Sequence, residues 1–519
     1  MIKTTLVSIP EENLENIEIE CLQAYLERKK YDVESIYLDP LKKIEEQFLC
    51  LDKKSRIFNL SVYSESSVYP KELLKFADLA KMIKNECESS VVLLSGKYAS
   101  VYYKDILKDK RFEAIDYIML GDCEYTLEKL IKIMSAKKNV NNFIKTNNNI
   151  ASRDSLDNKE FLNIDINALP FSKRTFLKKE ENKNKNYYAF IYESRGCSMQ
   201  CSFCTRGQFY KHWTGRSAKD IFEEIRNIVT FSKVRCFWFY GGSFEDPGGE
   251  RGKKKIKDFC TLVIESGLNI SMRCYLRSNF VAKVDQQLLD LMKKAGFQVV
   301  LVGIEAGNDF DLKLYNKGTT VENNILTLEK LRKAKIYSEH FGFIMINPYS
   351  TLERLRENFL FLQERQPHDL DNYVHHLILD PGTNIRRKVE NDGLMVPAED
   401  FVKQGISYRF VNSDVEEISQ FLKRNFLIFD TETAGTSTFV YHFAPFLPNQ
   451  PLYEEKILTI MQKRAKIFSE YFKILYINMD IGGCEKDYKE FISTIEEFEI
   501  QLRLLKGKMI RELVKYQIL

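Results

Sequence analysis

Three cysteines stand close together in the segment SRGCSMQCSFCTRG, where Cys197, Cys201 and Cys204 are separated by three and then by two residues. Three thiolates in so short a loop can bind three irons of a cubane iron–sulfur cluster, which leaves the fourth iron open to a small molecule. The alternatives are a zinc site that His212 would complete, or chance clustering. The spacing favours the cluster.

The elements that position this loop are expected to be strands alternating with helices. An apolar run ends just before the first cysteine, and six such runs separated by helical segments predict a partial (β/α)6 barrel. Reactive groups should then lie at the carboxyl ends of the strands. The expected strands are Tyr188–Glu193, Arg235–Tyr240, Asn269–Leu276, Gln298–Ile304, Tyr337–Ile346 and Tyr373–Leu379.

Four segments are predicted along the chain. Residues 1–136 alternate buried strands with helices, which indicates a Rossmann- or flavodoxin-like parallel sheet covered on both faces. The Lys/Asn-rich region 137–186 is expected to be a linker that wraps the surface, and the barrel occupies 187–395. Residues 396–519 are mostly helical and are expected to close the barrel mouth and set specificity. The predicted fold class is α/β with a helical C-terminal domain.

Composition limits the classes of function. The chain has 519 residues, and Lys+Arg 77 against Asp+Glu 73 gives a net charge of +4, which does not predict a nucleic-acid partner. No apolar run is long enough to span a bilayer. The amino terminus does not resemble a secretory signal, so we expect a cytoplasmic protein. In that compartment clustered cysteines indicate a metal or redox site and not disulfides.

The cysteine spacing resembles that of the radical S-adenosylmethionine (radical SAM) superfamily. The resemblance implies a four-iron four-sulfur cluster on Cys197, Cys201 and Cys204, whose open iron binds the amino and carboxylate groups of SAM. An electron delivered by an external flavodoxin- or ferredoxin-type donor would cleave SAM to a 5′-deoxyadenosyl radical that abstracts hydrogen from the substrate. Phe203 matches the family position near adenine, with an ordinary core aromatic as the alternative.

The second strand ends FYGGSFED, where the family places residues that receive the methionine amine. Gly241, Gly242 and Ser243 occupy that place, and the expected acid is displaced to Glu245. Glycines at a strand end suit the close approach of a ligand to the backbone. A plain turn explains them equally.

The third and fourth strands continue the resemblance. CYLRSN places Arg277 and Asn279 on one face of the strand, where the family contacts the SAM carboxylate and ribose. VLVGIEAGND carries Gly303 and Glu305, and the resemblance implies that Glu305 binds ribose hydroxyls or substrate. Lys317 extends the same pattern. The alternative for Arg277 and Asn279 is a solvent-facing strand end, and for Glu305 it is a solubilising charge.

Residues 1–136 resemble the cobalamin-binding domain that precedes many radical SAM barrels, through NLSVYS, VVLLSG and DYIMLGDCEYTLEKL. The resemblance implies cobalamin contacts at Ser64, Gly96 and Glu124. Ser95–Gly96–Lys97 stands where relatives often have a glycine pair, so an empty domain is an alternative. No histidine precedes His212, so the usual histidine ligand loop is absent and a bound cobalt would be base-off.

The favoured function is a radical SAM enzyme, specifically a cobalamin-dependent methyltransferase or related carbon-centre modifying enzyme of natural-product, peptide or lipid maturation. Its substrate would be a peptide or small molecule. One alternative is a cobalamin-free peptide-modifying enzyme, such as an epimerase, with a vestigial cobalamin domain. Its hydrogen donor would be a thiol such as Cys236, Cys274 or Cys484, although each also fits a buried apolar position. The other alternative is a non-catalytic iron–sulfur or zinc protein.

Overall fold

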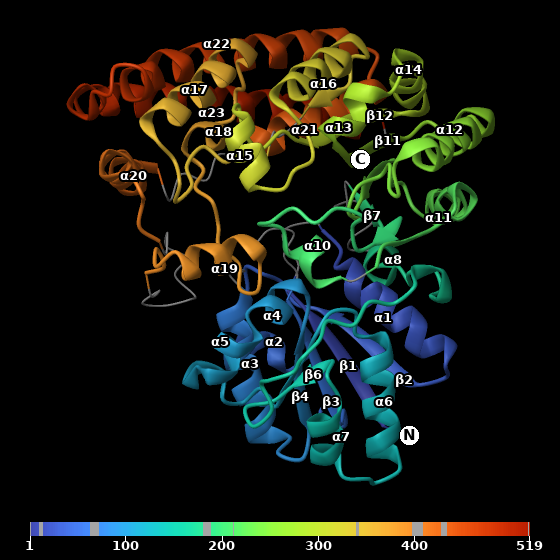
Figure 1. Ribbon diagram of the computed structural model, residues 1–519. Coiled ribbons are helices and arrows are strands. Elements are labelled where there is room, and N and C mark those ends of the chain that lie inside the picture. The colour runs from blue at the N-terminus through green and yellow to red at the C-terminus, as the bar shows by residue number, and fades with distance from the viewer. Residues whose placement is uncertain are drawn as a thin grey trace.

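A computed structural model of the chain describes residues 2–9, 14–62, 72–179, 188–210, 212–338, 342–396, 408–426, 433–516 and 518. Two parallel sheets account for its architecture. In Figure 1 the N-terminal sheet and its helices form the lower half, and the second sheet lies above it. The long C-terminal helices run across the top, on the side of the barrel away from the N-terminal domain.

The N-terminal sheet has the strand order β2-β1-β3-β4-β5-β6 and is parallel except for β6. One face packs on α3, α4 and α5, and the other on α1 and α6, so the strands are apolar on both sides. The strands are β1 (Lys3–Ser8), β2 (Asp32–Tyr37), β3 (Ile57–Ser61), β4 (Val91–Ser95), β5 (Tyr117–Met119) and β6 (Ile150–Ala151). The helices are α1 (Ile17–Arg28), α2 (Ile44–Phe48), α3 (Glu72–Glu86), α4 (Lys97–Val101), α5 (Tyr103–Lys108), α6 (Glu124–Ser135) and α7 (Val140–Thr146).

The second sheet is parallel, with the order β13-β12-β11-β10-β7, and curves into a partial barrel. Its outer face packs on helices in one large apolar core. The strands are β7 (Ala189–Ile191), β10 (Cys236–Phe239), β11 (Ser271–Arg277), β12 (Phe297–Gly303) and β13 (Tyr337–Ser338). The helices around and after them are α8 (Thr175–Lys178), α10 (Thr205–Phe209), α11 (Ala218–Phe231), α12 (Gly249–Ser266), α13 (Ser278–Lys283), α14 (Gln286–Ala295), α15 (Asp309–Leu314), α16 (Val321–Lys333), α17 (Leu352–Arg365), α18 (Asp371–Val374) and α19 (Asn384–Asn391).

Side-chain caps fix where the barrel helices begin. Ser217, Asp285, Thr320 and Thr351 each accept a hydrogen bond from a backbone N–H in the first turn of the helix that follows. Such a cap satisfies a donor that the helix itself leaves unpaired. Where each of these barrel helices begins is therefore set by residues next to it in the chain.

Two expectations about the elements need correction. Of the six predicted barrel strands, the last is reduced to a bridge between Ile346 and His376, because Asp371–Val374 forms a helical turn instead. That turn buries Tyr373, whose ring stacks on Phe472 of the C-terminal helices. In the predicted linker, Ile150–Ala151 forms β6 and pairs with β5, because its apolar side chains are fully buried.

The C-terminal helices were expected to close the barrel mouth, and this is wrong for α21 (Thr433–Phe443). The side chains of α21 pack against Cys236, Val299 and Tyr337, near the amino ends of the strands and opposite the cysteine loop. There, His442 Nδ1 and the Ser271 hydroxyl share a hydrogen bond of 2.7 Å. Helix α21 therefore closes the amino-terminal end of the barrel. The other C-terminal helices are α20 (Ser413–Phe426), α22 (Gln450–Tyr476) and α23 (Ile481–Lys515).

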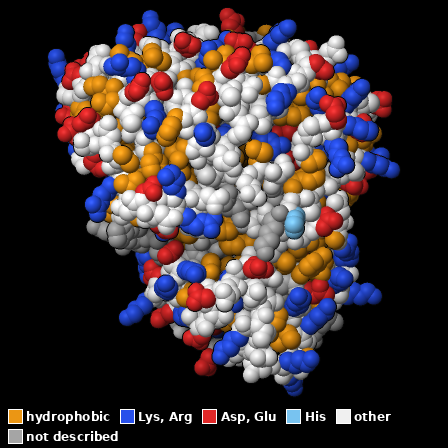
Figure 2. Space-filling view, viewed as in Figure 1, with side chains coloured by type: hydrophobic (Ala, Val, Ile, Leu, Met, Phe, Trp, Pro, Cys, Tyr) orange, Lys and Arg blue, Asp and Glu red, His pale blue; other side chains and the backbone are white. Residues whose placement is uncertain are grey.

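The face shown in Figure 2 mixes acidic and basic side chains over all parts of the chain, and neither sign forms a continuous field. This agrees with the small net charge of +4. Among the described helices, none combines the length and the apolar character that crossing a membrane requires.

Candidate active site

The three cysteines lie on the loop that follows β7, on the side of the barrel that faces the N-terminal domain. Strand β8 (Ser194–Arg195) pairs with β9 (Thr214–Gly215) and holds the start of the loop, and α10 follows its end. Gly196 has φ +77°, and a Cβ there would lie 2.5 Å from the His212 carbonyl oxygen. Glycine is therefore required at this turn. His212 itself is exposed.

The environment of the thiols suits metal binding and not free thiolate. Burial raises the pKa of Cys197 to about 12 and also raises the pKa of Cys201, so both are neutral without a metal. Lys317 and Arg277 oppose the shift at Cys201 because their positive charges favour thiolate. The Met199 backbone N–H lies 3.5 Å from the Cys197 sulfur. The loop thus provides soft ligands together with nearby positive charge.

Within the described residues, no three His, Cys, Asp or Glu side chains converge on one point as ligands of a single metal ion. A cubane does not need such convergence, because each thiolate binds a different iron. The donor set of three thiolates in one short loop therefore fits a four-iron cluster that is open at one iron.

Gly241 and Gly242 lie directly against this loop. A Cβ on Gly242 would come within 2.4 Å of the Gly196 carbonyl oxygen and 3.1 Å of the Cys197 Cβ. The Gly241 N–H donates to Glu193 Oε2 at 2.8 Å. Glu193, which the sequence analysis did not single out, is buried at the end of β7. The glycines therefore allow the chain after β10 to lie close to the cysteine loop.

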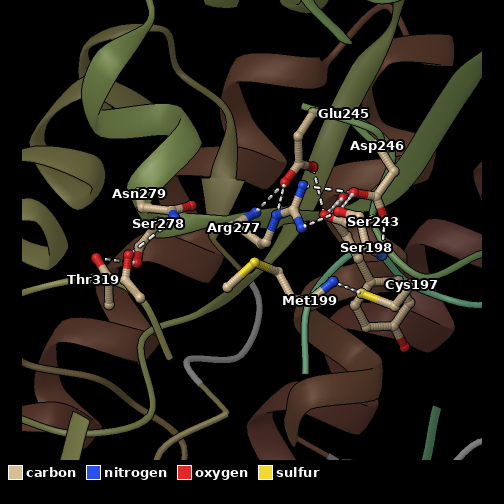
Figure 3. A network of polar contacts seen from close by, with 12 residues as sticks. Cys197, Ser198, Met199, Ser243, Glu245, Asp246, Arg277, Ser278, Asn279 and Thr319 are labelled. Carbon is tan, nitrogen blue, oxygen red and sulfur yellow. Dashed lines mark hydrogen bonds and ion pairs between the residues drawn. The ribbon is translucent and has the colours of Figure 1, made fainter. Parts of the chain in front are cut away.

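Arg277 lies at the centre of a network of polar contacts (Figure 3), and its partners are acids of this chain. Its Nε is 2.6 Å from Glu245 Oε1, and its Nη2 is 2.6 Å from Asp246 Oδ1. Nη1 donates to the Ser198 hydroxyl at 2.8 Å, and Ser198 donates to Asp246 at 2.5 Å. Ser243 donates to Glu245. Arg277 is thus bound to the cysteine loop through Ser198.

The partners of Arg277 in this network differ from those expected from the sequence. Arg277 was predicted to contact the SAM carboxylate, whereas its guanidinium faces two fully buried carboxylates. Burial raises the pKa of Glu245, and Arg277 opposes that shift. Asp246 and Ser198 were missed, because the sequence places them in two loops 48 residues apart. Their contact appears only when the ends of β7 and β10 meet.

The remaining predicted residues line the same edge. Asn279 Nδ2 donates to the Gly318 carbonyl at 3.0 Å (Figure 3). Glu305, in a left-handed backbone conformation at φ +65°, receives Lys317 Nζ at 2.6 Å. A Cβ at Gly303 would lie 2.3 Å from that Nζ, so glycine is needed to admit the lysine.

Lys317 joins the acid of β12 to the cluster loop. Burial lowers its pKa, but Glu305 and the thiols of Cys201 and Cys204 raise it more, so its pKa lies above the ordinary value. Phe203 packs edge-on against Tyr315, with ring centroids 5.6 Å apart. Its partly exposed ring lies in the loop between the second and third cysteines.

The residues predicted to contact cobalamin have other partners, or lie outside the described chain. Ser64 is outside the described residues. Gly96 has φ +106°, and a Cβ there would meet the Val62 carbonyl oxygen at 2.2 Å, so packing alone requires glycine. Glu124 Oε1 binds Arg195 Nη2 at 2.7 Å.

A polar pocket lies between the two sheets at their facing carboxyl ends. The N-terminal domain contributes Glu18, Lys97 and Asp122, whereas the barrel contributes side chains and backbone that adjoin the cysteine loop. Burial raises the pKa of Glu18 to about 7 and lowers the pKa of Lys97. The barrel residues are Tyr192, Ser194, Arg195, Gly196, Arg206, Tyr210, Tyr240, Gly241 and Gly242.

The thiols considered as hydrogen donors are all buried away from this edge. Cys236 lies at the amino end of β10, next to His442 of α21. Cys274 packs in the outer apolar core of the barrel, and Cys484 contacts Tyr471 within the C-terminal helices. Their placement agrees with a packing role.

A three-cysteine loop at the carboxyl edge of a partial barrel fits an iron–sulfur cluster that is open at one iron. Residues 191–362 match the family model of the Radical SAM superfamily. The chain is 26% identical over 335 residues to the anaerobic magnesium-protoporphyrin IX monomethyl ester cyclase of Cereibacter sphaeroides, a match that covers 62% of this chain and 52% of that protein. The chain thus spans about half the length of the curated relatives it matches.

Two solved structures share the fold. The cobalamin-dependent SAM radical enzyme OxsB with aqua-cobalamin bound has a TM-score of 0.73 and 18% identity, covering 99% of this chain and 80% of that chain. The radical SAM methyltransferase TsrM from Kitasatospora setae has a TM-score of 0.57 and 15% identity, covering 76% and 77%.

Residues 191–362 thus match a Radical SAM domain, and the chain shares its overall fold with OxsB, a cobalamin-dependent SAM radical enzyme. The predictions of the superfamily and of the fold class are confirmed. Its family implies a four-iron four-sulfur cluster and SAM as cofactors.

Proposed function

We propose that this chain is a cobalamin-dependent radical SAM methyltransferase, or a related carbon-centre modifying enzyme, that acts on a natural product, peptide or lipid. One observation carries the proposal: the carboxyl edge of the N-terminal sheet faces the cysteine loop across a shared polar pocket. A domain in that position covers the place where a radical forms, so it is suited to present a second cofactor to the substrate. The likeness to OxsB over 99% of the chain supports the same arrangement.

The chain's own residues have distinct tasks in this proposal. Cys197, Cys201 and Cys204 hold the cluster, which when bound supplies the electron that cleaves SAM. Gly242 lets the chain after β10 lie directly against the cysteine loop, because a side chain there would meet the Gly196 carbonyl oxygen and the Cys197 Cβ. Glu305, whose carboxylate lies 2.6 Å from Lys317 Nζ, offers an acceptor to a hydroxyl group.

The described residues do not by themselves identify a corrin site. Glu124 is engaged by Arg195, Gly96 is explained by packing, and Lys97 projects a charged side chain into the pocket. The support for cobalamin therefore comes from the likeness of the fold and not from these residues. We propose further that a low-potential donor of flavodoxin or ferredoxin type reduces the cluster in the cytoplasm.

A second candidate is a cobalamin-free radical SAM enzyme that modifies a peptide, for example an epimerase. Lys97 favours it, because this side chain stands where relatives often have glycine, and it enters the pocket between the domains. The direct ion pair of Arg195 with Glu124 also spans the interface without any cofactor.

The deciding experiment measures corrinoid bound to protein expressed with cobalamin uptake and then desalted. Near-stoichiometric corrinoid with a base-off spectrum supports the methyltransferase. Protein that cleaves SAM and never retains corrinoid overturns it in favour of the second candidate. Lys97→Gly is the matched variant, and increased corrinoid retention in it would identify Lys97 as the obstacle.

A separate measurement tests whether the chain is an enzyme of this class at all. Reconstituted protein incubated without oxygen with dithionite and SAM is expected to form 5′-deoxyadenosine. Protein that carries a full cluster and forms none would return the chain to the non-catalytic iron–sulfur alternative.

A further inference from the structure

Arg195 connects the cysteine loop to the N-terminal domain. It lies two residues before Cys197, and its guanidinium binds Glu124 in a two-pronged contact of 2.7 Å and 3.2 Å. Asp122 approaches the same guanidinium at 3.4 Å. All three charged side chains are at most 9% exposed. Glu124 begins α6, directly after the end of β5, so the contact joins the carboxyl ends of the two sheets.

The geometry of this contact fixes the guanidinium from both sides. Planar pairing of arginine with carboxylate is directional, and burial strengthens the attraction between the charges. The ring of Tyr192 lies 5.2 Å from the guanidinium carbon, and β8 is tied to β9 through the backbone. Removing only one partner of such a buried pair leaves an uncompensated charge, which forces the other to move.

Movement of Arg195 would pass directly to the first cluster ligand. Only Gly196 separates Arg195 from Cys197, and this glycine is confined by the His212 carbonyl oxygen. The far end of the loop is also held by the N-terminal half of the chain, because Phe209 stacks on Phe161 at 4.2 Å. The cysteine loop is therefore anchored at both ends on elements outside the barrel.

We propose that the Arg195–Glu124 ion pair is a positioning contact through which the N-terminal domain holds Cys197 in place for the cluster. Arg195 and Glu124 touch neither cluster nor substrate in this role. The role does not depend on whether cobalamin binds, so it stands apart from the proposed methyl transfer. The N-terminal domain then has a task that it keeps even in a cobalamin-free enzyme.

The test compares Glu124→Gln with Glu128→Gln in the full-length, reconstituted protein. Glu128 lies one turn further along α6 and binds Tyr25 and Lys132, both within the N-terminal part of the chain. We expect iron release to a chelator to be about tenfold faster in Glu124→Gln, as for other residues that orient metal ligands. The electron paramagnetic resonance signal of the reduced cluster should shift in the same variant. Glu128→Gln should match the wild type in both measurements.

Further variants separate positioning from general stabilisation. Arg195→Gln should release iron as fast as Glu124→Gln, and the double variant should add little to either, because both remove one contact. Thermal unfolding of the cluster-free protein is measured for each variant, so that iron release is compared only between variants of equal stability. Iron release and resonance signal unchanged in Glu124→Gln would overturn the proposal. Failure of both Glu124→Gln and Arg195→Lys to fold, while Glu128→Gln folds, would also overturn it, since the pair would then serve folding.

Discussion

The carboxyl edges of the two parallel sheets face each other, but they differ in whether their charged side chains form ion pairs. On the barrel edge, Arg277 and Lys317 each bind an acid within 2.6 Å. On the N-terminal edge, Glu18 and Lys97 form no hydrogen bond or ion pair through their side chains with any described residue. Between the two edges, Arg195 pairs with Glu124 and is also approached by Asp122.

This difference follows from what each edge has to hold. Paired charges on the barrel edge are fixed in direction, so they present a rigid frame to a cluster and to SAM, as preorganised sites require. Unpaired, partly buried charges are costly, and they persist where a ligand or solvent can compensate them. The barrel edge therefore holds its charged groups in fixed directions, whereas Glu18 and Lys97 on the N-terminal edge form no ion pair with a described residue.

The largest effect is expected from the loop on which the barrel edge depends. Replacing Cys197, Cys201 and Cys204 together with Ala should remove the brown iron–sulfur absorbance and all cleavage of SAM, because they are the clustered soft ligands of the chain. The check is iron content and 5′-deoxyadenosine after reconstitution. Wild-type iron content in the triple variant would contradict the cluster assignment.

The paired character of the barrel edge is tested at its central cation. Arg277→Met leaves Glu245 and Asp246 buried without their counter-charge, so the free energy of unfolding should fall by about 3 kcal/mol. Urea unfolding of cluster-free protein measures this. Arg251→Met, at an exposed position of α12, is the control, with an expected change within about 0.5 kcal/mol. Equal effects of the two variants would remove the distinction between the edges.

A finer test concerns the acid of β12. Glu305→Gln keeps the shape of the side chain but removes its charge, so Lys317 loses its partner and the predicted ribose contact weakens. We expect affinity for SAM to fall about tenfold, while iron content stays at the wild-type value. Equilibrium binding of SAM measures it, with the exposed Glu322→Gln as control. Unchanged affinity would make Glu305 a structural residue only.

The smallest effect is expected on the N-terminal edge, where Glu18 forms no ion pair with a described residue. Burial raises the pKa of Glu18 from 4.5 to about 7, so the folded protein holds a proton that the unfolded chain releases. Its contribution to stability is therefore present at low pH and lost as the pH rises from about 4.5 to 7. Glu18→Gln should flatten the stability profile between about pH 4.5 and 7, measured by unfolding at several pH values. An identical pH profile in the variant would show that Glu18 is compensated.

Much of the fold could be predicted because its determinants are local. The alternation of strands and capped helices is encoded in neighbouring residues, such as Ser217 and Asp285 at the starts of helices. The prediction of a sixth barrel strand was wrong because Tyr373 stacks on Phe472. Phe472 lies far along the chain, so no local sequence pattern could indicate this contact. Helix α21 was misplaced for a similar reason, since its partners are strand residues far earlier in the chain.

The sequence by itself determined the three-cysteine loop and the glycines of the barrel edge, because ligand spacing and backbone freedom belong to adjacent residues. Tertiary structure alone decided what the charged residues bind. From the sequence, Arg277 was assigned to a ligand. In the folded chain Glu245 and Asp246 bind it, because the ends of β10 and β11 lie side by side. Glu124 was assigned to a cofactor, but Arg195, 71 residues further on, binds it. Charges pair across space and not along the chain, so only the folded structure selects their partners.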